Sequence, residues 1–214
     1  MKRIAFYGGS FDPVHNGHMA IARAVTERFE IDRFVFIPAF HAPHKSRTKP
    51  TSAFDRYAML CLVTQNEASM NVSKIEVELP EKPFSVETLS SLNEQFANDE
   101  LFFVMGADSW MDITTWRHWE RVLMLTNHIV VTRPGIDLDT SHVSDEIRSR
   151  IVDIRSSKVR DSTGGEEQIF LSDLVNIDIS ATEIRRKARS SDPSWKRDVP
   201  DEVAIYIEKY QIYN

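Results

Sequence analysis

The chain opens with the order strand, glycine-containing loop, helix, and this order restricts the fold more than any other feature. Residues 3–7 form a short apolar run, which is typical of a strand buried in a parallel sheet. Gly8 and Gly9 end this run, and Pro13 favours a loop after them. Apolar side chains then recur at helical spacing, which predicts a helix beginning near residues 16–18. A buried strand that leads into a helix in this way predicts an α/β fold.

The rest of the chain continues the alternation of strands and helices. We predict strands at residues 4–7, 34–37, 73–79, 101–105 and 128–132. We predict helices at residues 18–29, 53–65, 86–96, 116–123, 145–155, 182–189 and 201–209. This alternation implies an α/β, Rossmann-like doubly wound parallel sheet with helices on both faces.

No repeat or long linker divides the chain. Residues 1–214 are therefore predicted to form a single domain, with a helical C-terminal part from about residue 180 to residue 214. The polar stretch 156–167, which contains Gly164 and Gly165, is predicted to be a mobile loop.

The segment 8–18, GGSFDPVHNGH, is suited to phosphate binding. The first amides of a helix lack intrahelical partners and, with the positive end of the helix dipole, favour anions. His15 and His18 lie within one turn of this helix start and add side-chain donors. The glycines do not follow the GxGxxG spacing, which disfavours a dinucleotide-binding loop. A metal site formed by His15, His18 and Asp12, and a purely structural role for the histidines, remain as alternatives.

The segment 179–185, ISATEIR, predicts a second helix start of the same kind. Ser180 can cap the helix, and Glu183 occupies the position of a capping-box partner. Thr182 offers a hydroxyl, and Arg185 presents a planar fork of donors that suits phosphate oxygens. The alternative is a capped surface helix with a basic face.

Together these two segments resemble the signatures of the nucleotidyltransferase superfamily, GxFDPxHxGH and ISSTxIR. Ser10 stands where the closest relatives usually have threonine and keeps the hydroxyl, whereas Ala181 replaces a serine and lacks one. The resemblance implies that both segments bind ATP. The implied ATP-binding residues within them are Gly8, Gly9, Ser10, Phe11, His15, His18, Ile179, Ser180, Thr182 and Arg185.

Segments between the two signatures resemble those of the bacterial nicotinate mononucleotide adenylyltransferases, so that the likeness spans roughly residues 2–186. In residues 38–45, PAFHAPHK, the resemblance implies that His44 and Lys45 contact the triphosphate of ATP. It also implies that Arg133, within TRPG, lies near the phosphates and binds the mononucleotide.

The same resemblance implies a binding site for the pyridine nucleotide. In residues 83–89, PFSVETL, backbone groups near Ser85 and Val86 would meet the pyridine carboxylate. In residues 106–116, GADSWMDITTW, Asp108 would bind the ribose and Trp116 would stack on the ring. Two alternatives stay open here: Asp108 as an ordinary helix cap, and Trp116 with Trp119 as a stripe that faces the core.

The activity implied by the resemblance is adenylyl transfer in NAD biosynthesis. The phosphate of nicotinate mononucleotide would attack the α-phosphorus of ATP and give deamido-NAD and pyrophosphate, with His15, His18, Lys45 and Arg185 as catalytic residues. Mg²⁺ is the expected cofactor, held mainly by ATP phosphates and water, and no protein metal site is expected. The alternatives are nicotinamide mononucleotide or phosphopantetheine as the acceptor, or a nucleotide-binding regulator without catalysis.

Composition excludes other classes of protein. The net charge of −6 argues against a general nucleic-acid binder, and the single cysteine, Cys61, cannot form an internal disulfide. The chain lacks a signal peptide and an apolar stretch of about 18 residues, so we expect a cytoplasmic protein without membrane spans. Small molecules are the expected partners, and a homo-oligomer remains open.

Overall fold

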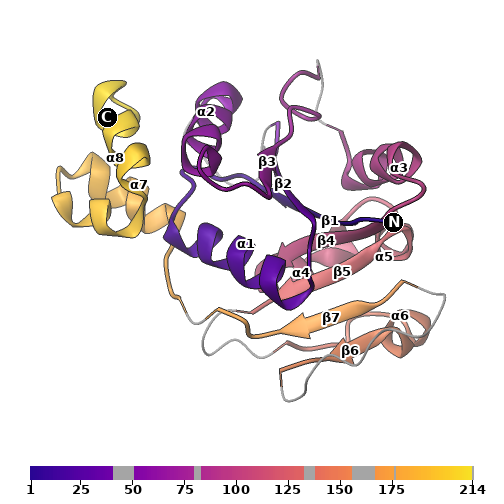
Figure 1. Cartoon of the computed structure of the whole chain (residues 1–214). Coiled ribbons are helices and arrows are strands. Elements are labelled where there is room, and N and C mark those ends of the chain that lie inside the picture. The colour runs from indigo at the N-terminus through magenta and orange to yellow at the C-terminus, as the bar shows by residue number, and fades with distance from the viewer. Residues whose placement is uncertain (41–50, 80–82, 133–137, 156–166, 176, 214) are drawn as a thin grey trace.

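A parallel sheet forms the centre of the molecule (Figure 1). The computed structural model describes residues 1–40, 51–79, 83–132, 138–155, 167–175 and 177–213. Within these residues the sheet has seven strands in the order β3-β2-β1-β4-β5-β7-β6, and every neighbouring pair is parallel. The strands are β1 (Arg3–Gly9), β2 (Arg33–Pro38), β3 (Met70–Val72), β4 (Glu100–Gly106), β5 (Asn127–Val131), β6 (Ile151–Asp153) and β7 (Ile169–Ser172).

Helices cover both faces of the sheet, which confirms the predicted doubly wound α/β class. One face packs against α1 (Asn16–Arg28), α2 (Ala53–Thr64), α7 (Ala181–Arg189), the 3-10 helix η2 (Pro193–Asp198) and α8 (Asp201–Lys209). The other face packs against α3 (Ser85–Gln95), α4 (Ala107–Met111), the 3-10 helix η1 (Ile113–Thr115), α5 (Trp119–Leu125) and α6 (Asp145–Ser149). In Figure 1, α7 and α8 lie at one end of the molecule, beside α1 and α2.

Alternation of side chains along each strand produces these two cores. In β1, Ala5 and Tyr7 face the first core, whereas Ile4 and Phe6 face the second. The other central strands repeat this pattern, because successive side chains of a strand point to opposite faces. Apolar residues on both faces explain why β1, β2 and β4 read as continuous apolar runs in the sequence.

The direction of chain winding reverses between β1 and β4. The chain moves outward from β1 through β2 to β3, then returns to pair β4 with the other edge of β1 and continues to β5. Ligands of open α/β sheets bind at such a switch point, outside the carboxyl ends of the strands. The loops that follow Gly9 of β1 and Gly106 of β4 are therefore the positions to examine for a site.

The strand predicted at residues 73–79 is wrong. The third strand is instead the short β3, and the chain turns directly after it, with the Ile75 amide donating to Ser73 Oγ at 3.2 Å. Ile75 packs partly against the second core and Val77 is buried, so their alternation reflects burial without strand pairing. Serine side chains commonly stabilise such turns by bonding to the backbone two residues on.

The helix predicted at residues 145–155 is wrong in its second half. Helix α6 ends at Ser149, and residues 151–153 form β6, which pairs with β7. Strand β7 was not predicted at all. Ile151 and Val152 are β-branched residues that favour strands, and pairing with a partner some eighteen residues away decides their conformation.

Other elements differ in their boundaries. The helix predicted at residues 116–123 is displaced to α5, after η1, and the short α4 was not predicted. Most of the loop predicted at residues 156–167 lies outside the described residues. No helix within the described ranges is long and apolar enough to cross a membrane.

Candidate active site

The segment 8–18 spans the end of β1, the loop that follows it and the start of α1, as predicted. His15 is the N-cap of α1 and is buried, with 4% of its surface exposed. Its ring stacks on that of His18, with centroids 3.6 Å apart. The backbone N–H of His15 donates to Nδ1 of His18 at 3.2 Å, so a neutral His18 carries its proton on Nε2. The two histidines therefore form one rigid unit at a helix start.

Three glycines of this segment, Gly8 and Gly9 at the end of β1 and Gly17 in α1, leave space for neighbouring rings. None of Gly8, Gly9 and Gly17 has a positive φ; each instead leaves room for an aromatic or imidazole ring. A Cβ atom at Gly8 would lie 2.9 Å from Phe103, and one at Gly9 would lie 2.9 Å from Phe11. Phe11 adopts the left-handed backbone conformation in this turn, with φ 47°. The centroid of its ring lies 5.0 Å from that of the His18 ring. The glycines thus allow the protein's own rings to pack beneath the loop.

The second predicted segment meets the first directly. Nη1 of Arg185, in the second turn of α7, donates to the carbonyl oxygen of Asp12 at 2.6 Å, and Nη2 donates to Thr182 Oγ1 at 3.3 Å. Asp12 and Arg185 are 173 residues apart in the chain. The helix start that carries ISATEIR therefore lies beside the helix start that carries the two histidines.

The capping predicted for α7 is wrong in detail. Ser180 is the N-cap residue, but its side chain makes no capping hydrogen bond. Glu183 pairs with Arg186, at 2.9 Å, because an arginine three residues along the same helix face is within reach. Ser180 is half-buried and Thr182 is exposed, while Ile179 packs partly against the first core.

Arg56 is a residue of this site that the sequence reading missed. Its guanidinium, 2% exposed, donates to four backbone carbonyls, those of Ser10, Ala39, Phe40 and Thr51, at 2.6 to 3.2 Å. Burial lowers the pKa of Arg56, and the Asp12 carboxylate opposes that shift. A signal existed in the sequence, since Arg56 lies on the same stripe of α2 as the buried Met59 and Leu60.

Tyr213 is a second residue that the sequence reading missed. Its hydroxyl donates to Oδ1 of Asp12 at 2.7 Å. The Asp12 carboxylate is thus engaged by a tyrosine from the far end of the chain, which gives it a structural partner.

The residues predicted to meet the pyridine ring lie on the opposite face of the sheet. Ser85 and Val86 are the first two residues of α3, whose backbone amides lack intrahelical acceptors. Trp116 and Trp119 are both half-buried against the second core. Part of each side chain therefore faces the core, as the alternative interpretation predicted. Arg117 places its guanidinium 4.5 Å from the centroid of the Phe84 ring and so joins the Trp116 segment to the start of α3.

Asp108 lies in the first turn of α4, just beyond the carboxyl end of β4. Its side chain is exposed, and its carboxylate makes no hydrogen bond within the described residues. The N-cap of α4 is Gly106, so Asp108 is not the capping residue. The carboxylate is therefore open to a ligand at the switch point.

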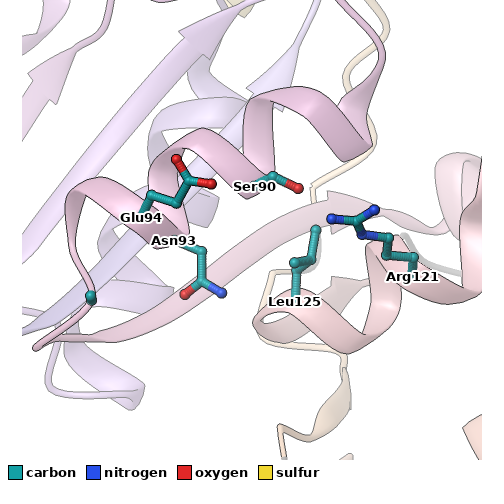
Figure 2. Close-up of a pocket in the computed structure, with 6 residues that line it drawn as sticks. Ser90, Asn93, Glu94, Arg121 and Leu125 are labelled. Carbon is teal, nitrogen blue, oxygen red and sulfur yellow. The ribbon is translucent and has the colours of Figure 1, made fainter.

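Three predicted residues, His44, Lys45 and Arg133, lie outside the described residues. A pocket of about 450 Å³ opens between α3 and α5, lined by Ser90, Asn93, Glu94, Ala97, Arg121 and Leu125 (Figure 2). It contains none of the predicted site residues. In the described part of the chain, no three His, Cys, Asp or Glu side chains gather to hold a metal ion.

The fold and the two adjoining helix starts define a nucleotide-binding protein of the doubly wound class. The chain belongs to the cytidylyltransferase-like family, whose model matches residues 6–187. Its curated relatives include a protein of Corynebacterium glutamicum named "Probable nicotinate-nucleotide adenylyltransferase", which is 32% identical over 99% of this chain and 88% of its own length. A protein of Desulfitobacterium hafniense with the same name is 33% identical over 99% of this chain and 96% of its own.

Solved structures share the fold. The nicotinic acid mononucleotide adenylyltransferase of Plasmodium falciparum, complexed with NaAD, superposes with a TM-score of 0.73 at 19% identity. The superposition covers 100% of this chain and 98% of that one. The same enzyme complexed with APC gives the same score. The arrangement of strands and helices is therefore that of these enzymes.

Proposed function

We propose that this protein transfers the adenylyl group of ATP to nicotinate mononucleotide, with formation of deamido-NAD and release of pyrophosphate, as a step of NAD biosynthesis. The phosphate oxygen of the mononucleotide attacks the α-phosphorus of ATP, and the bond from that phosphorus to the pyrophosphate oxygen breaks. Full-length relatives at 32–33% identity carry the name of this activity, and an enzyme of the same fold is complexed with NaAD.

One observation carries the proposal: the contact between Arg185 and the Asp12 carbonyl joins the two predicted phosphate-binding segments. The two helix starts lie close together, and we propose that their first amides and dipoles bind one polyphosphate. Transfer of a nucleotidyl group mostly requires positioned substrates and compensation of developing charge, and it needs no nucleophilic side chain.

Within this scheme, His15 and His18 hold and polarise the phosphates, with His18 donating through Nε2. Arg185 and Lys45 neutralise the departing pyrophosphate. The other groups proposed to bind ATP are Gly8, Gly9, Ser10, Phe11, His44, Ile179, Ser180 and Thr182. Ala181, at the position of a serine in the signature, offers no hydroxyl to the phosphates.

The acceptor is proposed to bind beside β4. The amides of Ser85 and Val86 would receive the pyridine carboxylate, Trp116 would stack on the ring, and Asp108 would accept hydrogen bonds from the ribose hydroxyls. Arg133 would contact the phosphate. An exposed carboxylate with no hydrogen bond to the described residues and an amide-rich helix start supply the acceptor and donor groups that such a molecule requires.

We propose that Mg²⁺ enters with ATP. Mg²⁺ retains several water ligands and binds through substrate phosphates, so it needs a site that accepts a metal–triphosphate complex rather than a protein cage. The helix starts and the basic side chains near them fit such a complex. The ion would offset charge on the phosphates during transfer.

Pyrophosphate release tests the proposal. The purified protein, ATP and Mg²⁺ are incubated separately with nicotinate mononucleotide, nicotinamide mononucleotide or phosphopantetheine. We expect strong preference for the nicotinate form. Preference for either other acceptor would overturn the substrate assignment, and thermal stabilisation by ATP without any release would identify a regulator without catalysis.

A further inference from the structure

Tyr213, in the segment after α8, is buried in the first core, with 8% of its surface exposed. It adopts a left-handed backbone conformation, with φ 77°. Its hydroxyl reaches across 201 residues of sequence and donates to Oδ1 of Asp12 at 2.7 Å. A buried tyrosine hydroxyl needs a partner, and here that partner is a carboxylate within the loop between β1 and α1.

Asp12 occupies a central position in this loop. The residue is itself buried, with 9% exposed, and its backbone carbonyl accepts the hydrogen bond from Arg185. Val14, which follows Pro13, is fully buried, and His15 comes next as the N-cap of α1. With so little freedom between Asp12 and His15, the position of Asp12 determines where the stacked His15 and His18 rings lie.

Arg56 complements this arrangement from α2. It fixes the Ser10 carbonyl on the other side of the loop, and its positive charge attracts the Asp12 carboxylate. The pKa of Tyr213 is raised, first by burial and then by the charge of Asp12, so the hydroxyl remains a donor at neutral pH. The loop is thus held by three distant elements: α2, α7 and the segment after α8.

We propose that Tyr213 is a positioning residue for adenylyl transfer, which acts through Asp12 to hold the His15–His18 pair in the geometry that the reaction requires. This inference rests on the proposed function for its kinetic test. It adds to the reaction a residue that touches neither nucleotide.

The variant Tyr213→Phe tests this role, because it keeps the buried ring and removes the hydroxyl that donates to Asp12. The same hydroxyl also forms a hydrogen bond with the Thr51 side chain, which the variant loses as well. The matched control is Tyr206→Phe. Tyr206 also donates to an aspartate, Asp55 of α2, at 2.8 Å, but it does not touch the loop. We expect Tyr213→Phe to lower kcat about tenfold with KM values changed less than about twofold, since small displacements of catalytic groups slow the chemical step. Tyr206→Phe should retain the kcat of the parent protein.

A second readout does not depend on catalysis. The imidazole nitrogen resonances of His15 and His18 in the nucleotide-free protein should shift in Tyr213→Phe and stay in place in Tyr206→Phe. This result would support the positioning role even if nicotinate mononucleotide were not the acceptor. Unchanged resonances together with unchanged kcat in a folded Tyr213→Phe protein would overturn the inference, and so would equal losses of kcat in both variants.

Coupling to Asp12 gives the last test. In an Asp12→Ala protein, the additional change Tyr213→Phe should lower kcat by less than about twofold, because the partner through which it acts is already absent. Two losses that multiply independently would show that Tyr213 does not act through Asp12.

Discussion

The two halves of the site are held in different ways. On the β1 side, Arg56, Arg185 and Tyr213 reach the loop of residues 8–15 from three distant elements with hydrogen bonds of 2.6 to 2.7 Å. On the β4 side, Asp108 is exposed without a hydrogen bond in the described residues, and Trp116 is held by packing against the second core. The side proposed to bind phosphates is fixed, and the side proposed to bind the pyridine nucleotide is more open.

The difference between the fixed half and the open half fits the function proposed for each. Electrostatic stabilisation of a transition state is effective when the hydrogen-bond donors are already in place. Donors that first had to move into position would slow the reaction. Recognition of a flat ring depends mainly on contact area and tolerates small displacements. The comparison teaches that tertiary hydrogen bonds are concentrated on the side where charge is proposed to develop.

Replacement of Arg56 should have the largest effect on the fixed half. Arg56→Met removes the donor from four backbone carbonyls and the positive charge that attracts the Asp12 carboxylate, and we expect the free energy of unfolding to fall by about 3 to 5 kcal/mol. Urea denaturation measures this change. Arg33→Met, which removes an exposed arginine bonded to Asn71, is the control and should cost about 0.5 kcal/mol or less. A similar small cost for Arg56→Met would contradict the clamping role.

His18→Ala should remove a catalytic donor from the same half. We expect kcat to fall at least about a hundredfold, which corresponds to the about 2.7 to 4 kcal/mol that one well-placed donor contributes. Steady-state pyrophosphate release measures the loss, and the thermal unfolding curve establishes that the fold is retained. Turnover close to that of the parent protein would reject a catalytic role for His18.

Burial of His128 in β5, next to β4, should make the stability of the folded protein sensitive to acid. It is fully buried in β5, its ring lies 5.8 Å from Phe103 of β4, and burial lowers its pKa from 6.5 to about 4. Below pH 6.5 the unfolded chain binds a proton that the folded protein does not bind, so stability falls as the pH drops from 6.5 toward 4. The expected loss is about 2 kcal/mol at pH 5.

Urea denaturation of the parent protein and of His128→Asn at several pH values measures this contribution. The variant should show a shallower decline between pH 6.5 and pH 4, whatever its stability at neutral pH. Identical slopes in the two proteins would mean that His128 does not cause the acid sensitivity.

The smallest effect is expected on the open half. Trp116→Ala should raise KM for nicotinate mononucleotide about tenfold, because the stacking surface is lost, with little change in kcat or in KM for ATP. The control is Trp119→Ala, since Trp119 also packs against the second core. Equal changes in both variants would assign Trp116 to the core alone.

Much of this architecture could be predicted from the sequence. The loop after β1, the strands β1, β2, β4 and β5, and the helices α1, α2, α3, α7 and α8 follow from apolar periodicity and from turn-forming residues. Two segments were assigned wrongly because pairing between strands depends on distant residues, which the local pattern does not contain. The segment 73–79 alternates like a strand, but after the bond from the Ser73 amide to the Phe36 carbonyl it joins no strand of the described sheet, while residues 151–153 continue a helical pattern and yet pair with β7.

Local spacing thus determined most of the strands and helices and where the groups proposed to bind phosphates stand along the chain, since these properties depend on neighbouring residues. Only the tertiary structure decided which groups meet. The bond from Tyr213 to Asp12 and the four bonds of Arg56 join residues far apart in sequence. Buried polar groups must find partners wherever the folded chain supplies them, and no local pattern specifies those partners.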